Sequence, residues 1–181
     1  RTEAINTQCV KLYLNGSTNP IKVGDIADSV DFYPNVVIEN CRFENNRARG
    51  ILVGTNKRTV IRNNYFHICG VAIKLESDCD YWYESGGIGE LVIENNIFDR
   101  CLRAERNWGN EIIYATPRNK TEAGKYYHGK IIIRNNDFSS TDAVIADIEN
   151  VEEIEITDNK SNNFSGPFNL RHYKNCNIHK K

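Results

Sequence analysis

The stretch Val60-Ile61-Arg62-Asn63-Asn64-Tyr65-Phe66 recurs along the chain and decides the fold. Copies read Val37-Ile38-Glu39-Asn40-Cys41-Arg42-Phe43, Val92-Ile93-Glu94-Asn95-Asn96-Ile97-Phe98 and Ile132-Ile133-Arg134-Asn135-Asn136-Asp137-Phe138, and a decayed copy covers 155–159. The central Ile stands at positions 38, 61, 93, 133 and 156, with spacings of 23, 32, 40 and 23. The unit is therefore about 23 residues long, with two insertions in the middle of the chain.

Each copy alternates with period two, which predicts a strand, and a second short apolar strand follows each Phe. Thr59, Ile61 and Asn63 are expected on one side, and Val60, Arg62 and Asn64 on the other. One such unit cannot bury its own apolar face, but stacked units share a continuous core. The sequence therefore predicts an all-β fold, a parallel β-helix of about six to seven coils. Weaker copies at 10–15 and near Ile178 would form the first and last coils.

The repeat also explains why 24 of the 181 residues are Asn. Asn tolerates the left-handed backbone of a tight turn, and its amide can hydrogen-bond along a stack. We expect an Asn ladder at one turn of successive coils, made by Asn40, Asn63, Asn95 and Asn135 with Asp158. The Phe residues are expected to stack as an inner ladder of Phe43, Phe66, Phe98 and Phe138.

Composition excludes several functions. The formal net charge of −1 favours neither nucleic acid nor an anionic membrane as a partner. The longest apolar runs, such as 112–115, are far too short for a membrane span. The chain lacks Met and begins with Arg1, which predicts a processed or excised piece. We expect residues 1–181 to form a single domain belonging to a longer solenoid.

The six cysteines follow no zinc-binding spacing, so no metal site is predicted from them. Cys69 and Cys101 each stand eight residues after the repeated Ile, on neighbouring coils. They could be stacked free thiols, which we favour, or a disulfide. Beside the strands, His67 and His128 are expected to be structural.

Function in a solenoid is expected where the chain departs from its repeat. The departures are the insertions 76–90, 99–110 and 116–129, and the first and third leave the same corner of consecutive coils. They are rich in carboxylates and aromatic residues, as a sugar site requires. We therefore predict that these three insertions form a carbohydrate-binding groove.

Carboxylates around this groove allow two chemistries. Glycoside hydrolysis needs one protonated and one ionised carboxyl, and Asp78 and Glu111 come from adjacent insertions. A polysaccharide lyase would instead hold calcium with such carboxylates and use a nearby base. Candidate bases are Arg47, Arg49, Lys74 and Arg118. Spacing alone leaves both alternatives open.

The chain resembles glycoside hydrolase family 110, the exo-acting α-1,3-galactosidases. The likeness runs over about 37–160 and is carried by Arg47-Ala48-Arg49-Gly50-Ile51-Leu52-Val53, by the repeat at 60–66, by Gly70-Val71-Ala72-Ile73 and by Tyr127-His128. Its most specific part is Asp80-Tyr81-Trp82-Tyr83-Glu84-Ser85-Gly86. The resemblance implies a right-handed parallel β-helix and inverting hydrolysis of a terminal α-galactosyl bond without a cofactor.

Carried over residue by residue, the resemblance implies that Asp78 is the base that activates water, together with Asp80, and that Glu111 is the proton donor. Family members carry paired adjacent acids before the Trp, whereas Ser77 stands at one of those positions here. The substrate-binding residues expected around this pair are Arg49, Glu76, Trp82, Glu84, Trp108 and Arg118.

Three functions remain as hypotheses. The first is a glycosidase for terminal α-galactosyl glycans. The second is a non-catalytic carbohydrate-binding β-helix or degenerate homologue, and the third is the calcium-dependent lyase. The resemblance also implies an exported bacterial protein, periplasmic, secreted or on the cell surface. Oligomeric state is left open.

Overall fold

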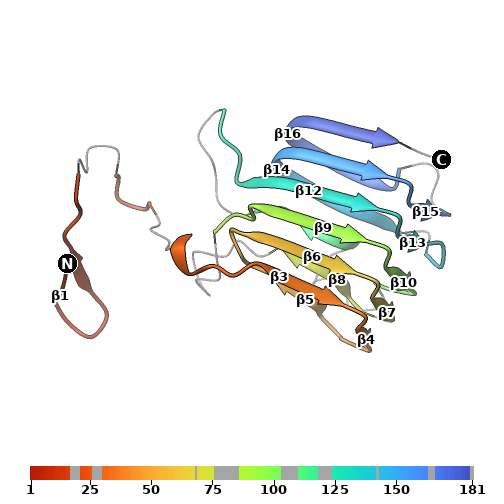
Figure 1. The fold of residues 1–181 in the computed structure, drawn as a ribbon, viewed down its shortest axis with the longest axis horizontal. Helices are drawn as coiled ribbons and strands as arrows, with labels where there is room; N and C mark the ends of the chain where they lie inside the picture. The colour runs from red at the N-terminus through yellow and green to blue at the C-terminus, as the bar shows by residue number, and fades with distance from the viewer. Residues whose placement is uncertain are drawn as a thin grey trace.

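The computed structural model describes residues 1–16, 21–25, 30–67, 69–75, 86–102, 110–117, 124–141, 143–162 and 166–179. Within these ranges the chain winds into a stack of short parallel strands (Figure 1). The strands form three faces, which we number in the order in which each coil visits them.

The first face carries the Ile of each repeat. It consists of β3 (Val36–Glu39), β6 (Arg58–Arg62), β9 (Glu90–Glu94), β12 (His128–Arg134) and the second halves of β14 (Val144–Thr157) and β16 (Phe168–His179). The repeated Ile residues pair in direct register at 38, 61, 93, 133, 156 and 178. Six coils are therefore stacked on this face, as the repeat predicts.

The second and third faces complete each coil. The second consists of β4 (Arg42–Glu44), β7 (Tyr65–His67), β10 (Ile97–Asp99), β13 (Asp137–Phe138) and β15 (Lys160–Ser161). The third consists of β5 (Arg49–Val53), β8 (Val71–Leu75), β11 (Glu111–Ala115) and the first halves of β14 and β16. All pairs between coils are parallel, which confirms the predicted β-helix.

Aliphatic and aromatic side chains fill the interior between the faces. Ile61, Ile93 and Ile133 have no exposed surface. The predicted Phe ladder is confirmed, with ring centroids 4.9 Å apart between Phe43 and Phe66. The next two spacings, to Phe98 and then to Phe138, are 4.8 and 4.6 Å, and the rings lie nearly parallel.

The Asn ladder is confirmed, but one residue later than predicted. Asn63 and its equivalents have the predicted left-handed backbone, with φ of 54 to 57° for the four Asn and 55° for Asp158. Their side chains lie outside the core, because the left-handed residue ends the strand alternation. The next residue points inward. Asn64 Nδ2 donates to Asn96 Oδ1 at 3.1 Å, and the series continues through Asn136 to Asn159 at 3.0 Å each.

The N-terminal residues do not form the first coil that we predicted. Instead, β1 (Thr2–Ala4) and β2 (Val10–Leu12) pair antiparallel in a hairpin that lies apart from the stack in Figure 1. Tyr13 donates its hydroxyl to Glu3 at 2.6 Å across this hairpin. A single 3₁₀ turn, η1 (Val30–Phe32), precedes the first coil. No helix in the described ranges has the length and apolar character required to cross a membrane.

Candidate functional site

The first and third insertions begin at adjacent points of the third face. The first follows β8, which ends at Leu75, and the third follows β11, which ends at Ala115. These strands pair in parallel, with Ile73 level with Ile113. Two departures from the repeat therefore leave the same edge of neighbouring coils.

The described C-terminal ends of these two insertions also lie side by side. Gly129 N–H donates to the carbonyl of Ile88 at 2.8 Å, and Lys130 N–H donates to that of Gly89 at 2.9 Å. The contact is close enough that a Cβ added to Gly87 would lie 1.8 Å from the carbonyl oxygen of Tyr127. The two segments thus return to the first face in van der Waals contact.

His128 lies at this junction and is 1% exposed. Its Nδ1 accepts a hydrogen bond from Ile88 N–H at 3.2 Å, so its proton is on Nε2, for which the described residues offer no partner. Burial lowers the pKa of His128 to about 4. The imidazole is therefore neutral and is held on one side only, through Nδ1.

Of the predicted site residues, Glu111 and Arg49 lie in the described part of the chain. Glu111 is the first residue of β11 and is 9% exposed. Its Oε2 accepts a hydrogen bond from the backbone N–H of Asn110 at 2.9 Å. The remaining predicted site residues lie outside the described residues: Glu76, Asp78, Asp80, Trp82, Glu84, Trp108 and Arg118.

The register of the third face brings Arg49 and Glu111 onto one row. Arg49 pairs with Val71 on the next strand. Ile73 pairs with Ile113, and because Val71 and Glu111 each stand two residues before these Ile residues, they are also level with each other. Arg49 and Glu111 are therefore two strands apart, separated by Val71. This places a guanidinium-bearing residue and a buried carboxyl on neighbouring parts of the face from which the insertions depart.

A second cluster, which the sequence analysis did not identify, lies on the second face. His67 Nδ1 and the Tyr65 hydroxyl each lie 2.7 Å from Asp99 Oδ2. Arg100 lies 3.4 Å from the same carboxylate and 3.2 Å from His67 Nε2. Hydrogen bonds from the Tyr65 hydroxyl, His67 and Arg100, together with the charge of Arg100, lower the pKa of Asp99 to about 2. Tyr65 and His67 belong to one coil, and Asp99 and Arg100 belong to the next. The hydrogen bonds of this cluster therefore link neighbouring coils.

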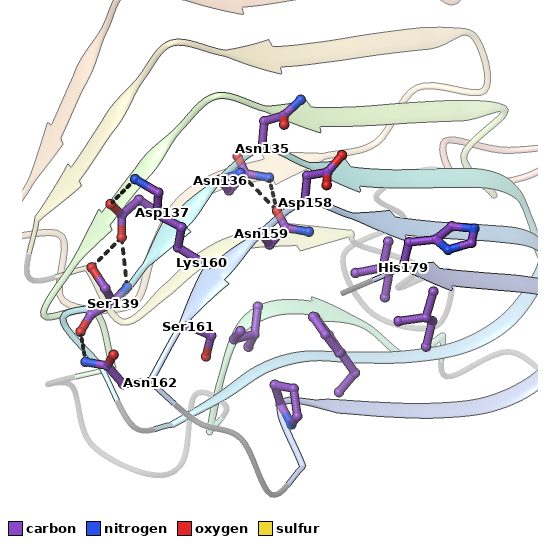
Figure 2. A pocket seen from close by; sticks show the side chains of 15 residues that line it. Asn135, Asn136, Asp137, Ser139, Asp158, Asn159, Lys160, Ser161, Asn162 and His179 are labelled. Carbon is purple, nitrogen blue, oxygen red and sulfur yellow. Dashed lines mark hydrogen bonds and ion pairs between the residues drawn. The ribbon is translucent and has the colours of Figure 1, made fainter. Parts of the chain in front are cut away.

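A cavity of about 790 Å³ opens at the last coils. Ser161 pairs in register with Phe138, so a small hydroxymethyl group stands where the preceding coils have an aromatic ring. Figure 2 shows its polar rim, which includes Asp137, Asp158 and His179. The described residues that line this cavity include none of the predicted site residues.

Comparisons with known proteins agree with the fold. The family model described as the right handed beta helix region matches residues 12–107. The α-1,3-galactosidase B of Akkermansia muciniphila is 35% identical over 165 residues, which cover 86% of this chain and 21% of that protein. The α-1,3-galactosidase A of Shewanella woodyi is 35% identical over 141 residues, 77% of this chain and 23% of that protein.

A third relative, the α-1,3-galactosidase B of Bacteroides fragilis, is 33% identical over 156 residues, 81% of this chain and 26% of that protein. The chain thus spans about a fifth to a quarter of the length of these curated relatives. The predicted resemblance to the exo-α-1,3-galactosidases of glycoside hydrolase family 110 is confirmed. We conclude that the chain belongs to the right-handed parallel β-helix family and that its sequence is related to α-1,3-galactosidases.

Proposed function

We propose that the protein is a glycoside hydrolase that removes terminal α-1,3-linked galactose from oligosaccharides with inversion at the anomeric carbon. One observation carries the proposal, namely the 33–35% identity to proteins named α-1,3-galactosidase over 77–86% of the chain. Export of the protein is part of the same proposal and rests on the resemblance alone.

The third face supports this chemistry because it holds the side chain of one candidate acid, Glu111, in place. Inverting hydrolysis needs a carboxylic acid that protonates the leaving oxygen and a carboxylate that activates water on the other side of the sugar. Glu111 belongs to a strand rather than a loop, and its Oε2 is held by Asn110 N–H at 2.9 Å. We assign it the role of proton donor.

Geometry sets a condition on the base. Glu111 is level with Val71 at the start of β8, whereas Asp78 follows the end of that strand at Leu75. Four residues of strand separate these levels by about 13 Å. Inverting enzymes hold their two carboxyls about 6.5–9.5 Å apart. A base that acts with Glu111 must therefore lie closer to it than the end of β8 does, and we assign this role to Asp78 together with Asp80.

Galactose release tests the proposal. The full-length protein is incubated with an α-1,3-galactosyl disaccharide and with its α-1,6-linked isomer, and free galactose is measured. We expect release from the first substrate. Glu111→Gln and Asp78→Asn should each lower kcat by about 10²–10⁴-fold. The matched control is Glu94→Gln, since Glu94 also belongs to a strand but forms an ion pair with Arg134 at 2.7 Å on the first face.

The alternatives give different results. Binding of α-galactosyl glycans without any hydrolysis would support the non-catalytic β-helix and overturn the proposal. Loss of activity on chelation, with an unsaturated product, would identify a lyase. Wild-type activity in the Glu111→Gln variant would remove Glu111 from the mechanism.

A further inference from the structure

Cys69 and Cys101 occupy equivalent positions on neighbouring coils, three residues after the stacked rings of Phe66 and Phe98. The two segments are in direct contact, because Leu102 N–H donates to the carbonyl of Cys69 at 2.7 Å. Neighbouring parallel strands are about 4.8 Å apart, which lies within the range of Cα separations that a disulfide spans.

Both thiols are enclosed. Cys69 is 0% and Cys101 is 5% exposed, and both are free thiols. Each thiol points toward the coil before it. Cys69 Sγ donates to the carbonyl of Phe43 at 3.4 Å, and Cys101 Sγ donates to the carbonyl of Phe66 at 3.8 Å. A Cβ on Gly50 would lie 2.6 Å from the carbonyl oxygen of Ala72 and 3.4 Å from Cys69 Sγ, so the preceding coil packs directly against this sulfur.

The two sulfurs differ in character. A hydrogen bond from Cys101 lowers the pKa of Cys69, since it stabilises the Cys69 thiolate. The same hydrogen bond and burial raise the pKa of Cys101, which stays protonated. Cys69 is therefore the more readily ionised of the two sulfurs, and Cys101 stands on the next coil, as the partner of an attacking cysteine must.

We propose that Cys69 and Cys101 are a peroxide-oxidisable dithiol that closes into a disulfide between the second and third coils. The Cys69 thiolate attacks one oxygen of hydrogen peroxide, which breaks the O–O bond, forms the sulfenic acid and releases one water after proton transfer. Cys101 then attacks Cys69 Sγ and displaces the hydroxyl as a second water. In total two thiols and one peroxide yield one disulfide and two waters. Peroxide is small enough to reach sulfurs that a bulkier disulfide reagent cannot.

The cross-link would stabilise the solenoid where the second insertion begins. Cys101 and Leu102 are the third and fourth residues of this insertion, and Leu102 is the last described residue before position 110. The disulfide closes a loop that contains the first insertion and restricts the unfolded chain, and it should raise the Tm by roughly 5–15 °C.

The test uses the full-length protein in which Cys9, Cys41, Cys79 and Cys176 are replaced by Ser, so that Cys69 and Cys101 are the cysteines left in this chain. It is treated with hydrogen peroxide and analysed by intact mass, non-reducing peptide mapping and thermal unfolding. We expect the loss of two hydrogens, a Cys69–Cys101 peptide pair, and a raised Tm that returns to its starting value with a reductant.

Single variants test the assignment of roles. In Cys101→Ser, Cys69 should stop at the sulfenic acid and be trapped by dimedone once the oxidised protein is unfolded in its presence, whereas in Cys69→Ser the remaining Cys101 should react many-fold more slowly. The proposal is overturned if peroxide leaves both thiols reduced, if over-oxidation occurs without a cross-link, or if both single variants are trapped equally. Because the readouts are mass and Tm, this test is independent of galactosidase activity.

Discussion

Gly87 and Tyr127, which are 40 residues apart in the sequence, meet so closely that a Cβ on Gly87 would lie 1.8 Å from the carbonyl oxygen of Tyr127. Gly87 lies near the end of the first insertion and Tyr127 near the end of the third, so this contact sets the separation of the two segments expected to form the groove. A backbone oxygen cannot swing away as a flexible side chain can.

Gly87→Ala is expected to lower stability by about 3 kcal/mol and to reduce kcat/KM, because the two segments must separate to admit the methyl group. Thermal unfolding and galactose release measure the two effects. Gly166→Ala is the control, since a Cβ there meets nothing within 4 Å. Unchanged stability in Gly87→Ala would mean that the two segments do not pack as described.

Asn96→Ala should cost about 3–5 kcal/mol of unfolding free energy. The Asn96 amide donates to the carbonyl of Ile61 at 2.9 Å and to Asn136 at 3.0 Å, and it accepts from Asn64. Its removal leaves several buried groups unsatisfied, at about 1–3 kcal/mol each. Denaturant unfolding measures the loss. Asn95→Gly, at the exposed left-handed neighbour, should change stability by only a few tenths of a kcal/mol.

Phe98→Ala should destabilise the fold by about 3–5 kcal/mol, because it opens a cavity between two stacked rings and removes both ring contacts. Ile97→Ala, one residue earlier, is the control because Ile97 is 49% exposed. Chemical denaturation of both variants provides the comparison, and equal losses would contradict the inner aromatic ladder.

His128 should make stability depend on pH. Burial lowers its pKa from 6.5 to about 4, so the folded state binds this proton less readily than the unfolded chain. The contribution is fully present above pH 6.5 and falls as the pH drops toward 4, by about 3 kcal/mol in total.

Unfolding free energies of the wild type and of His128→Gln between pH 4 and 7 provide the measurement, and the wild type should show the steeper decline. Asp99, whose pKa is lowered from 3.8 to about 2, contributes only below this window. Parallel curves for the two proteins would contradict the assignment.

Much of the fold could be predicted from the sequence because stacked coils repeat their side chains at fixed offsets. The Ile at 38, 61, 93, 133 and 156 predicted the register of the first face, and the Phe five residues later predicted the ring stack. The hydrogen-bonded Asn was placed one residue early, because both Asn64 and Asn63 fit the repeat. Only the turn geometry shows that the left-handed residue faces outward.

Other features followed from contacts that the repeat does not encode. Residues 10–15 resemble a coil strand but lack a Phe at the ladder position, and local pairing through Glu3 and Tyr13 produces a hairpin instead. His67 and Asp99 each stand six residues after the repeated Ile, so the repeat alone places them at equivalent positions of neighbouring coils. The catalytic residues proposed within the insertions have no repeat from which a position could be predicted.

The most direct measurement is an NMR time course of α-1,3-galactosyl disaccharide hydrolysis by the full-length protein, which reports both bond cleavage and the first anomer formed. Inverting hydrolysis with Glu111 as the acid predicts β-galactose as the initial product and at least a 10²-fold loss of rate in Glu111→Gln. Initial release of α-galactose, or a disaccharide that stays intact, would contradict the proposed function.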